Sequence, residues 1–519
     1  MTVDLTVRRL SGRAAGCSPS NRTNFTVMSD TSADVGTRTE EVQSFRSQLE
    51  ELSLDSPEST NDQPLPTQST PAALLALPDE LLAEIFSYGS AGPDAYHEVS
   101  SIEPNSERAQ APFQRAAVSR QWRAAALSAS PLWHYLLIPQ TLIWSTDDAK
   151  SRIILEYAEL VLERSRSFPI DIMFEFIESS AAAVAGLQPI FAAMRQSQSR
   201  WRRFLVRIRG QRAVNALLRC LEGPTPRLRT LQIVHQKTVQ TWGFSAARNE
   251  YLWMDETEEE DSNETHVVPT ILTDAPKLCW LTVVNLPDLP NHIALSPASE
   301  LFSLEFISVS WKPCFWSLLG ANKGVRRLML GAIDELPESV EPIELPGLQR
   351  LWLLQGGSRI LAKQPDLLQL PSLKTLSMVY GSFRGMERFL TGVRDVLTYL
   401  DLQLVEHLNK IDVDVLADLP HINQLRLAET LVPDTWLERL CRSSDPIMWP
   451  KLSWLGFKRC KIEELQNARL VEFARMRGGA SDTQAHDRWV SVHMRLGRCH
   501  VPDEQIDQLK QLCTRLTLL

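Results

Sequence analysis

Histidine, cysteine and carboxylate side chains are the groups through which this chain could bind a metal or attack a substrate. The sequence holds 10 His and 8 Cys in 519 residues, but neither a C-x-x-C nor an H-E-x-x-H spacing that would gather ligands around zinc. The one close Cys–His pair is Cys499 and His500, whose side chains would point to opposite faces of a strand. The acidic run from Asp255 to Glu264 lacks the D-x-[DN]-x-[DN]-G order of a calcium loop. We therefore predict no catalytic residue and no metal site, and we expect the acidic run to be an exposed loop.

Phosphate and cofactor chemistry have no support in the sequence either. Neither G-x-G-x-x-G nor G-x-x-x-x-G-K-[ST] occurs, and these turns are what bring backbone N–H groups to a phosphate. The formal net charge is −9, which argues against a surface built to neutralise nucleic acid. No apolar run of about 18 residues is present, the length that a membrane span requires. We predict no cofactor, no nucleic acid and no membrane partner, and an enzyme hidden in the chain is the least favoured alternative.

The N-terminal segment differs in composition from the rest. Residues 1–72 are rich in Ser, Thr, Asp, Glu and Pro, and such a segment buries too little apolar surface to offset the entropy of ordering it. We predict a disordered tail with a marginal amphipathic helix over residues 40–54. The arginines Arg8, Arg9 and Arg13 give it a secondary resemblance to a mitochondrial presequence. The widely separated cysteines favour reduced thiols and a location in the cytoplasm or nucleus.

Two helical segments are predicted between residues 73 and 140. In the first, Pro78 occupies the first turn, where its missing N–H costs nothing, and Asp79 and Glu80 follow near the positive end of the helix dipole. The second covers residues 113–130 and sets Val118 and Trp122 on one face. A module of this size has too small a core to bury all of its large apolar side chains. We therefore expect it to keep an apolar face for a partner.

The same residues carry a family resemblance. Leu77, Pro78, Leu81, Ile85 and Phe86, followed by Val118, Arg120, Trp122 and Arg123 and by Pro131, Leu132 and Trp133, resemble an F-box of the large fungal, basidiomycete-type families. Two departures are a longer loop over residues 87–112 and Ser119 in place of the usual Cys. The resemblance implies an F-box domain over residues 73–140 that binds a Skp-family adaptor and, through it, a cullin. The adaptor contacts that it implies are Leu77, Pro78, Leu81, Ile85, Phe86, Val118, Trp122, Leu132 and Trp133.

A repeat follows the helical segment. The phrase P-x-L-x-x-L-x-[apolar], with or without its Pro, begins at residues 226, 276, 299, 323, 346, 371, 395, 420 and 450. Its first apolar residues are spaced by 50, 23, 24, 23, 25, 24, 25 and 30 residues, within the range of leucine-rich repeats. These anchors are Leu228, Leu278, Leu301, Val325, Leu348, Leu373, Leu397, Ile422 and Leu452. The interval of 50 is either two repeats or one repeat with an insertion.

These patterns predict an α/β fold: a small helical F-box followed by a leucine-rich-repeat-like β/α solenoid with a parallel concave sheet. We expect a linker helix over residues 141–164 and the solenoid over residues 165–519, with weaker strands at 169–176 and 201–208. Helices near residues 385–396 and 434–443 should form the convex side. A strand at 488–496 and a helix at 502–513 would form a C-terminal cap.

Alternation within L-x-x-L-x-L sends every second side chain to the concave surface. Trp, Tyr and Arg dominate binding hot spots, so we predict a partner-binding surface from those types. Its members are Trp280, Arg327, Arg350, Trp352, Tyr399, Arg426 and Trp454. The alternative, left open for each aromatic residue, is that a loop covers it or that it packs sideways between repeats.

Together these features favour a substrate-recognition subunit of an SCF-type (Skp adaptor–cullin–F-box) E3 ubiquitin ligase. In this interpretation the box binds the adaptor, the solenoid binds an unknown target protein, and the chain itself is not an enzyme. The alternative is an F-box and repeat scaffold with no role in ubiquitin transfer.

Overall fold

A computed structural model describes residues 77–90, 105–138, 148–176, 181–236, 240–245, 250–255, 269–286, 289–296, 299–308, 313–331, 341–354, 356–381, 383–405, 415–430, 432, 434–441, 448–460, 464–478, 493–497, 499, 501–513 and 515–518. The predictions for residues 1–72, and for the acidic run beyond Asp255, lie outside these residues. The chain divides into two compact units. The first is formed by Met1–Leu278 with Ala294–Ser296, and the second by Cys279–Ile293 with Pro297–Leu519.

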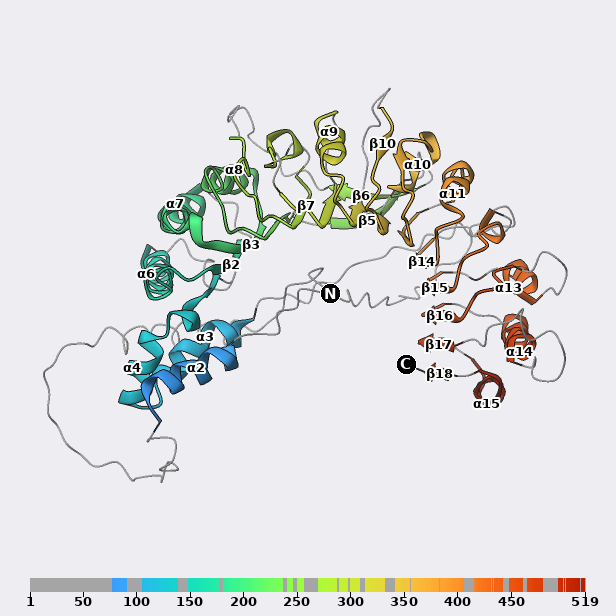
Figure 1. Ribbon diagram of the computed structural model, residues 1–519, viewed down its shortest axis with the longest axis horizontal. Helices are drawn as coiled ribbons and strands as arrows, with labels where there is room; N and C mark the ends of the chain where they lie inside the picture. Colours follow the sequence, from blue (N-terminus) through green and yellow to red (C-terminus); the bar gives the residue numbers. More distant parts are fainter. Residues whose placement is uncertain are drawn as a thin grey trace, which may run out of the picture. The chain divides into compact units, whose positions relative to one another are not determined.

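The first unit begins with a helical module, drawn in blue in Figure 1. It contains α2 (Asp79–Ser90), α3 (Ser106–Ala116), α4 (Arg120–Ser128) and the 3-10 turn η2 (Ser130–Trp133). The helix predicted from Pro78 is confirmed. The prediction of one helix over residues 113–130 is wrong, because the Ser119 side chain accepts a hydrogen bond from the Trp122 N–H and starts a new helix there. The predicted loop over 87–112 is too long at both ends, since α2 reaches Ser90 and α3 begins after the Asn105 cap.

Four parallel strands follow in the first unit: β1 (Tyr135–Ile138), β2 (Ile170–Phe176), β3 (Trp201–Ile208) and β4 (Thr230–His235). They are connected by α6 (Asp148–Arg164), α7 (Ala181–Gln196), the turn η3 (Gln198–Arg200) and α8 (Gln211–Cys220). The weak strands predicted at 169–176 and 201–208 are confirmed as β2 and β3. Strand β1 escapes sequence prediction because its four residues are all apolar and buried, without alternation.

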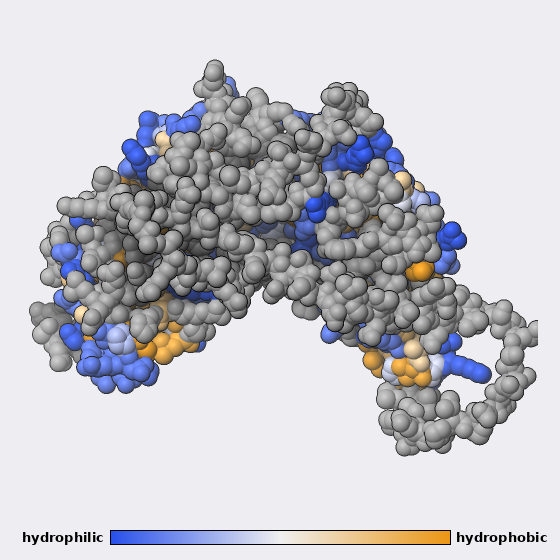
Figure 2. All heavy atoms as spheres, turned by 180° about the vertical axis from the view of Figure 1, so that it is seen from behind, coloured by the Kyte–Doolittle hydropathy of each residue, from blue (hydrophilic) through white to orange (hydrophobic). Residues whose placement is uncertain are grey.

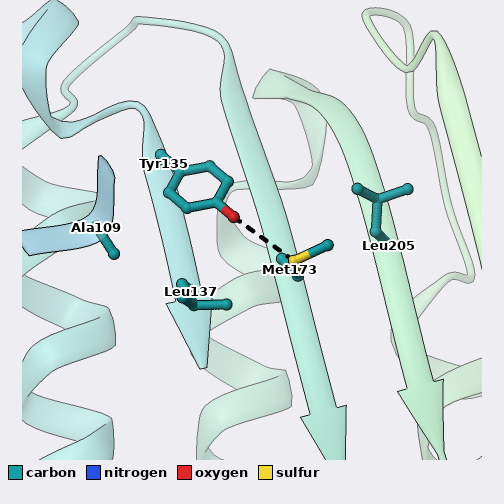
Figure 3. Close-up of a cluster of buried hydrophobic side chains, with 5 residues drawn as sticks. All are labelled: Ala109, Tyr135, Leu137, Met173 and Leu205. Atoms are coloured by element: carbon teal, nitrogen blue, oxygen red, sulfur yellow. Dashed lines mark hydrogen bonds between the residues drawn. The ribbon is translucent and has the colours of Figure 1, made fainter. Parts of the chain in front are cut away.

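The helical module packs against these strands. Ala109 of α3 lies in one apolar cluster with Tyr135 and Leu137 of β1, Met173 of β2 and Leu205 of β3 (Figure 3). The Tyr135 hydroxyl donates to the Met173 sulfur at 3.5 Å. Both faces of β1 are therefore buried, and the module shares a core with the start of the repeat array.

In the described residues of the second unit, ten parallel strands follow one another in chain order in the main sheet. They are β7 (Trp280–Val284), β8 (Ser303–Ile307), β9 (Arg327–Leu330), β11 (Arg350–Leu354), β13 (Thr375–Val379), β14 (Tyr399–Gln403), β15 (Gln424–Ala428), β16 (Trp454–Lys458), β17 (His493–Gly497) and β18 (Arg515–Leu518). Between them lie η4 (Leu289–His292), α9 (Pro313–Ala321), α10 (Ser358–Lys363), α11 (Glu387–Val393), α13 (Asp434–Cys441), α14 (Glu464–Gly478) and α15 (Asp503–Leu512). The helices α9 to α15 lie on one side of the strands (Figure 1), as do β10 (Ile343–Glu344) and β12 (Leu368–Gln369), which pair with each other.

All nine repeat strands predicted from the sequence are present, so the leucine-rich-repeat-like fold is confirmed. Each anchor is buried, and the Pro two residues before it has a structural reason. The Leu348 N–H donates to the Leu345 carbonyl at 3.1 Å, closing a turn that holds Pro346 at its second position. Pro has no N–H to lose there and its fixed φ suits that position. The same bond closes the turns before Leu228, Leu278, Leu373 and Leu452.

A second recurring feature follows the strands. The residue after six of them has a positive φ of 50–58° although it is not glycine. Its N–H often donates to the last residue of the next strand, as from Tyr380 to the Gln403 carbonyl at 3.1 Å. These residues are Asn285, Ser308, Tyr380, Leu404, Glu429 and Arg459. The left-handed residue thus turns the chain out of the strand while linking neighbouring repeats.

Two irregular regions complete the fold. Within the interval of 50 residues, β5 (Gln240–Ser245) and β6 (Glu250–Asp255) form an antiparallel hairpin. No further parallel strand lies between His235 and Trp280 in the described residues, so this interval is one repeat with an insertion. At the C-terminus, the predicted helix is confirmed as α15, and the predicted strand is described from His493 onward as β17. Strand β18 adds one more parallel pairing to β17.

Candidate functional site

The helical module exposes an apolar face. Of the six large hydrophobic side chains that are exposed in the described residues, four belong to this module: Leu81 at 46%, Ile85 at 52%, Tyr88 at 75% and Val118 at 55%. Leu81, Ile85 and Tyr88 are spaced by four and three residues, so they share one side of α2. We call these four residues the helical apolar face; hydrophobic surface of the module is visible as orange at lower right in Figure 2.

Other residues predicted to contact the adaptor lie in the core of the module, beneath the helical apolar face. Phe86, Leu132 and Trp133 are buried, so the structure does not leave them free for a partner. The Phe86 ring packs on that of half-buried Trp122, with centroids 4.8 Å apart. Helical periodicity explains the division, because Leu82 and Phe86 occupy the inner side of α2 and Leu81 and Ile85 the outer side.

Hydrogen bonds fix the module's three helices to each other. Arg115 of α3 donates to the Phe86 carbonyl at 2.8 Å and Gln121 of α4 donates to the half-buried Leu77 carbonyl at 2.8 Å. The Trp133 indole N–H donates to the Ala126 carbonyl at 2.8 Å. Pro78 is exposed, and its carbonyl accepts the first N–H groups of α2. The apolar face is therefore held rigidly by buried neighbours.

A buried carboxylate ties the module to the strands. Asp171 of β2 accepts two hydrogen bonds of 2.7 Å from the Arg202 guanidinium, and Arg108 of α3 lies 3.5 Å away. Burial alone would raise the pKa of Asp171, but the hydrogen bonds and charge of Arg202 and the charge of Arg203 hold it below its usual range. Arg108 also contacts the buried His134, whose pKa is lowered by burial and by the charge of Arg108. These charges position α3 on the first strands.

In the second unit, the first and third residues of each strand form matched rows on the face opposite the buried leucines. We call this the strand face. Trp280 and Arg327, both predicted for partner binding, come together there, with the Arg327 guanidinium 5.7 Å from the Trp280 ring and 5.1 Å from that of Phe302. Trp280 is only 7% exposed, so the expectation that it is presented to a partner is wrong. It is packed sideways against the next repeats, which is the alternative left open by the sequence.

A carboxylate beside this pair is part of the same cluster. The Trp280 indole N–H donates to Thr282 Oγ1 at 3.2 Å, and the Thr282 hydroxyl donates to Glu305 Oε2 at 2.9 Å. Burial raises the pKa of Glu305 to about 7, although Thr282 and the charge of Arg327 act in the opposite direction. This cluster satisfies its own polar groups and does not resemble an open binding surface.

Farther along the array, Tyr399, Arg426 and Trp454 also come together. The Tyr399 and Trp454 rings meet edge to face with centroids 6.5 Å apart. Arg426, on the strand between them, donates to Asp401 Oδ2 at 3.1 Å. All three residues predicted here are half-buried rather than covered. Arg350 is exposed on β11 and Trp352 is half-buried beside it.

Sequence reasoning missed four polar residues on this part of the strand face. They are Lys458 at the end of β16, His493 and Arg495 on β17, and Arg515 on β18. Strand alternation could have identified them, because every second residue of β16, β17 and β18 lies on the strand face in register with the preceding strand. Tyr88 of the helical apolar face could have been found from its spacing to Ile85.

Within the described part of the chain, no group of three or more His, Cys, Asp or Glu side chains is placed to hold a metal ion. The predicted Cys499–His500 pair lies partly outside the described residues, because His500 is not among them. None of the described helices combines the length and apolar character needed to cross a membrane.

Comparison with known proteins assigns the chain to no family. No model of a protein family matches the sequence, and no curated protein matches it. Among solved structures, the chain is similar to an internalin from Listeria monocytogenes, with 12% sequence identity and a TM-score of 0.31. The match covers 72% of this chain and 94% of the internalin.

Proposed function

We propose that this chain is the substrate-recognition subunit of an SCF-type E3 ubiquitin ligase. The observation that carries the proposal is the helical apolar face. Leu81 and Ile85 are exposed on one side of α2, and Val118 is exposed in the same module, whose inner residues are already packed. Exposed large apolar side chains on one side of a helix mark an interaction site. These are also residues of the F-box resemblance. In this proposal the face binds a Skp-family adaptor, and through it a cullin, in the cytoplasm or nucleus.

The array behind the module supplies the second half of the proposed function. Its strand face presents half-buried aromatic and arginine side chains, the types that dominate protein-binding hot spots. A target held there would be kept close to the ubiquitin-loaded enzyme, which raises the effective concentration of its lysines. Catalysis would then require no reacting group from this chain.

The test is recovery of the adaptor. The variant Leu81→Asp/Ile85→Asp places two charges in the helical apolar face and should reduce co-purified Skp adaptor at least about tenfold, because burying an unpaired charge is costly. The matched control is Phe168→Asp/Leu518→Asp, which changes the two exposed large hydrophobics outside the module. Wild-type adaptor recovery with the Leu81→Asp/Ile85→Asp variant would reject the proposal.

A scaffold without ubiquitin transfer is the alternative, and it uses the same surfaces. Cullin would distinguish the two. Recovery of cullin together with the adaptor supports the ligase subunit, whereas adaptor without cullin supports the scaffold.

A further inference from the structure

The end of the strand face carries basic side chains that the proposed function does not assign. Lys458, Arg495 and Arg515 lie on three successive strands, with Arg426 and Trp454 beside them. We call these five residues the basic strand face. Arg495 and Arg515 are exposed. His493 is the register partner of Arg515 and lies two residues before Arg495 on β17, so the three share one face of the sheet. The pKa of His493 is lowered by partial burial and by the two arginine charges.

The positive charge of this face is not neutralised by its described surroundings. Among the described residues, Asp401 is paired with Arg426 at 3.1 Å and also feels the charge of Lys458, and Glu429 is paired with Arg459 at 3.3 Å. No carboxylate among the described residues forms an ion pair with Lys458, Arg495 or Arg515. Because the whole chain has a net charge of −9, a local excess of positive charge is a specific feature of this face rather than a general property of the surface.

An aromatic ring lies within the same face. The Trp454 indole is folded along its own strand over Gly456, since a Cβ at Gly456 would meet Cζ3 at 2.9 Å and Cζ2 at 3.0 Å and would come closer still to Cη2. The Tyr399 ring lies edge to face with the indole, with centroids 6.5 Å apart. The indole is thus held flat beside Arg426, half-exposed, where it can contact an apolar side chain of a ligand.

We propose that the basic strand face binds a short acidic segment of a protein, with carboxylates on Lys458, Arg495 and Arg515 and an apolar side chain on Trp454. The inference rests on the proposed function, because it names the chemistry of the segment by which a target is recognised. Strands β15 to β18 span about 14 Å, which four or five extended residues would cover. A nucleic acid fits less well, since Asp401 lies in the same rows and the chain as a whole is acidic.

The experiment is a fluorescence-anisotropy titration of the full chain with a labelled peptide, Glu-Asp-Glu-Phe-Glu-Asp-Glu. The comparison probes are the same peptide with Gln and Asn in place of the acids, and an oligouridine RNA. Replacing the acids should weaken binding at least about tenfold at low salt. Arg495→Glu/Arg515→Glu should have an effect of similar size, and Trp454→Ala should weaken binding about fivefold.

The matched control is Lys363→Glu/Arg475→Glu, which reverses two exposed charges in the last turns of α10 and α14. It should change affinity less than about twofold. Absence of binding by the acidic peptide, equal binding of the neutral peptide, or equal losses in the control would overturn the inference, and tighter binding of oligouridine would replace it with a nucleic-acid site.

Adaptor recovery, measured on the same variants, separates this inference from the proposed function. If the adaptor co-purifies and the acidic peptide does not bind, the inference alone fails. If the peptide binds and the adaptor is never recovered, the site exists but the proposed function fails.

Discussion

At the scale of single residues, Gly456 and Trp454 depend on each other. Gly456→Ala should destabilise the chain by about 1–3 kcal/mol, because the new methyl group would overlap the indole ring and force it to move. In a Trp454→Ala background the same substitution should be nearly neutral, since the ring is gone. A double-mutant cycle from urea denaturation measures this coupling. Equal costs in both backgrounds would show that the indole does not lie over Gly456.

Glu305 predicts a pH dependence. Burial raises its pKa from 4.5 to about 7, so the folded chain retains this proton longer than the unfolded chain as pH rises. Stability should therefore fall between about pH 4.5 and 7 and then level off, by about 2 kcal/mol after allowing for partial exposure.

Two substitutions check that assignment by urea denaturation across this pH range. Glu305→Gln should remove this part of the slope. Thr282→Val should move the slope to higher pH, because it removes a hydrogen bond that favours the ionised carboxylate. An unchanged slope in Glu305→Gln would assign the pH dependence to other groups.

At the scale of elements, Asp171 joins α3 to the first strands. Asp171→Asn should destabilise the chain by about 3–5 kcal/mol, because it leaves Arg202 and Arg108 partly buried without a countercharge. Glu175→Gln is the matched control on the same strand; its carboxylate pairs with Arg207 at 2.9 Å in a more accessible position, so the loss should be about 1 kcal/mol or less. Chemical denaturation gives both values, and similar losses would contradict a special role for Asp171.

Element by element, the sequence predicts the strands better than the helical module. A repeated pattern of anchors such as Leu348 and Leu373 predicts where each strand lies and which of its side chains point into the core. It can do so because each of the nine predicted repeat strands buries its second and fourth side chains. The module lacks such repetition. In the module, the Ser119 hydroxyl caps α4 and so sets the boundary between α3 and α4. The sequence alone does not distinguish a Ser that caps a helix from a Ser inside one.

The candidate site could be predicted only in part. Alternation correctly places Tyr399, Arg426 and Trp454 on one face, because strand periodicity is a local property. It cannot show that Trp280 is covered, since that depends on how Arg327 and Phe302, from later repeats, pack against it. Similarly, the pairing of Asp171 with arginines from two other elements depends on tertiary contacts that no spacing in the sequence encodes.

At the scale of the whole molecule, α15 and β18 cover part of the apolar interior of the second unit. Deleting residues 498–519 removes α15, with its buried Leu509, and uncovers the edge of β17. We expect the shortened chain to retain most of its secondary structure, because each repeat contacts mainly its neighbours. It should also self-associate, since the apolar side chains that pack against Leu509 of α15 would become exposed.

Light scattering after size-exclusion chromatography, together with thermal denaturation by circular dichroism, checks this prediction. A monomeric shortened chain with an unchanged midpoint would show that β18 and α15 do not protect the array.

In the second unit, each strand pairs residue by residue with the next, although the segments that connect the strands differ in length. Successive strand starts are separated by as few as 22 residues, from His493 to Arg515, and by as many as 39, from Trp454 to His493. Variation in length is therefore confined to the segments that return from one strand to the next. For protein engineering, this makes those segments the natural positions for an affinity tag or a fluorophore, because residues added there leave the spacing of the strand-face rows unaltered.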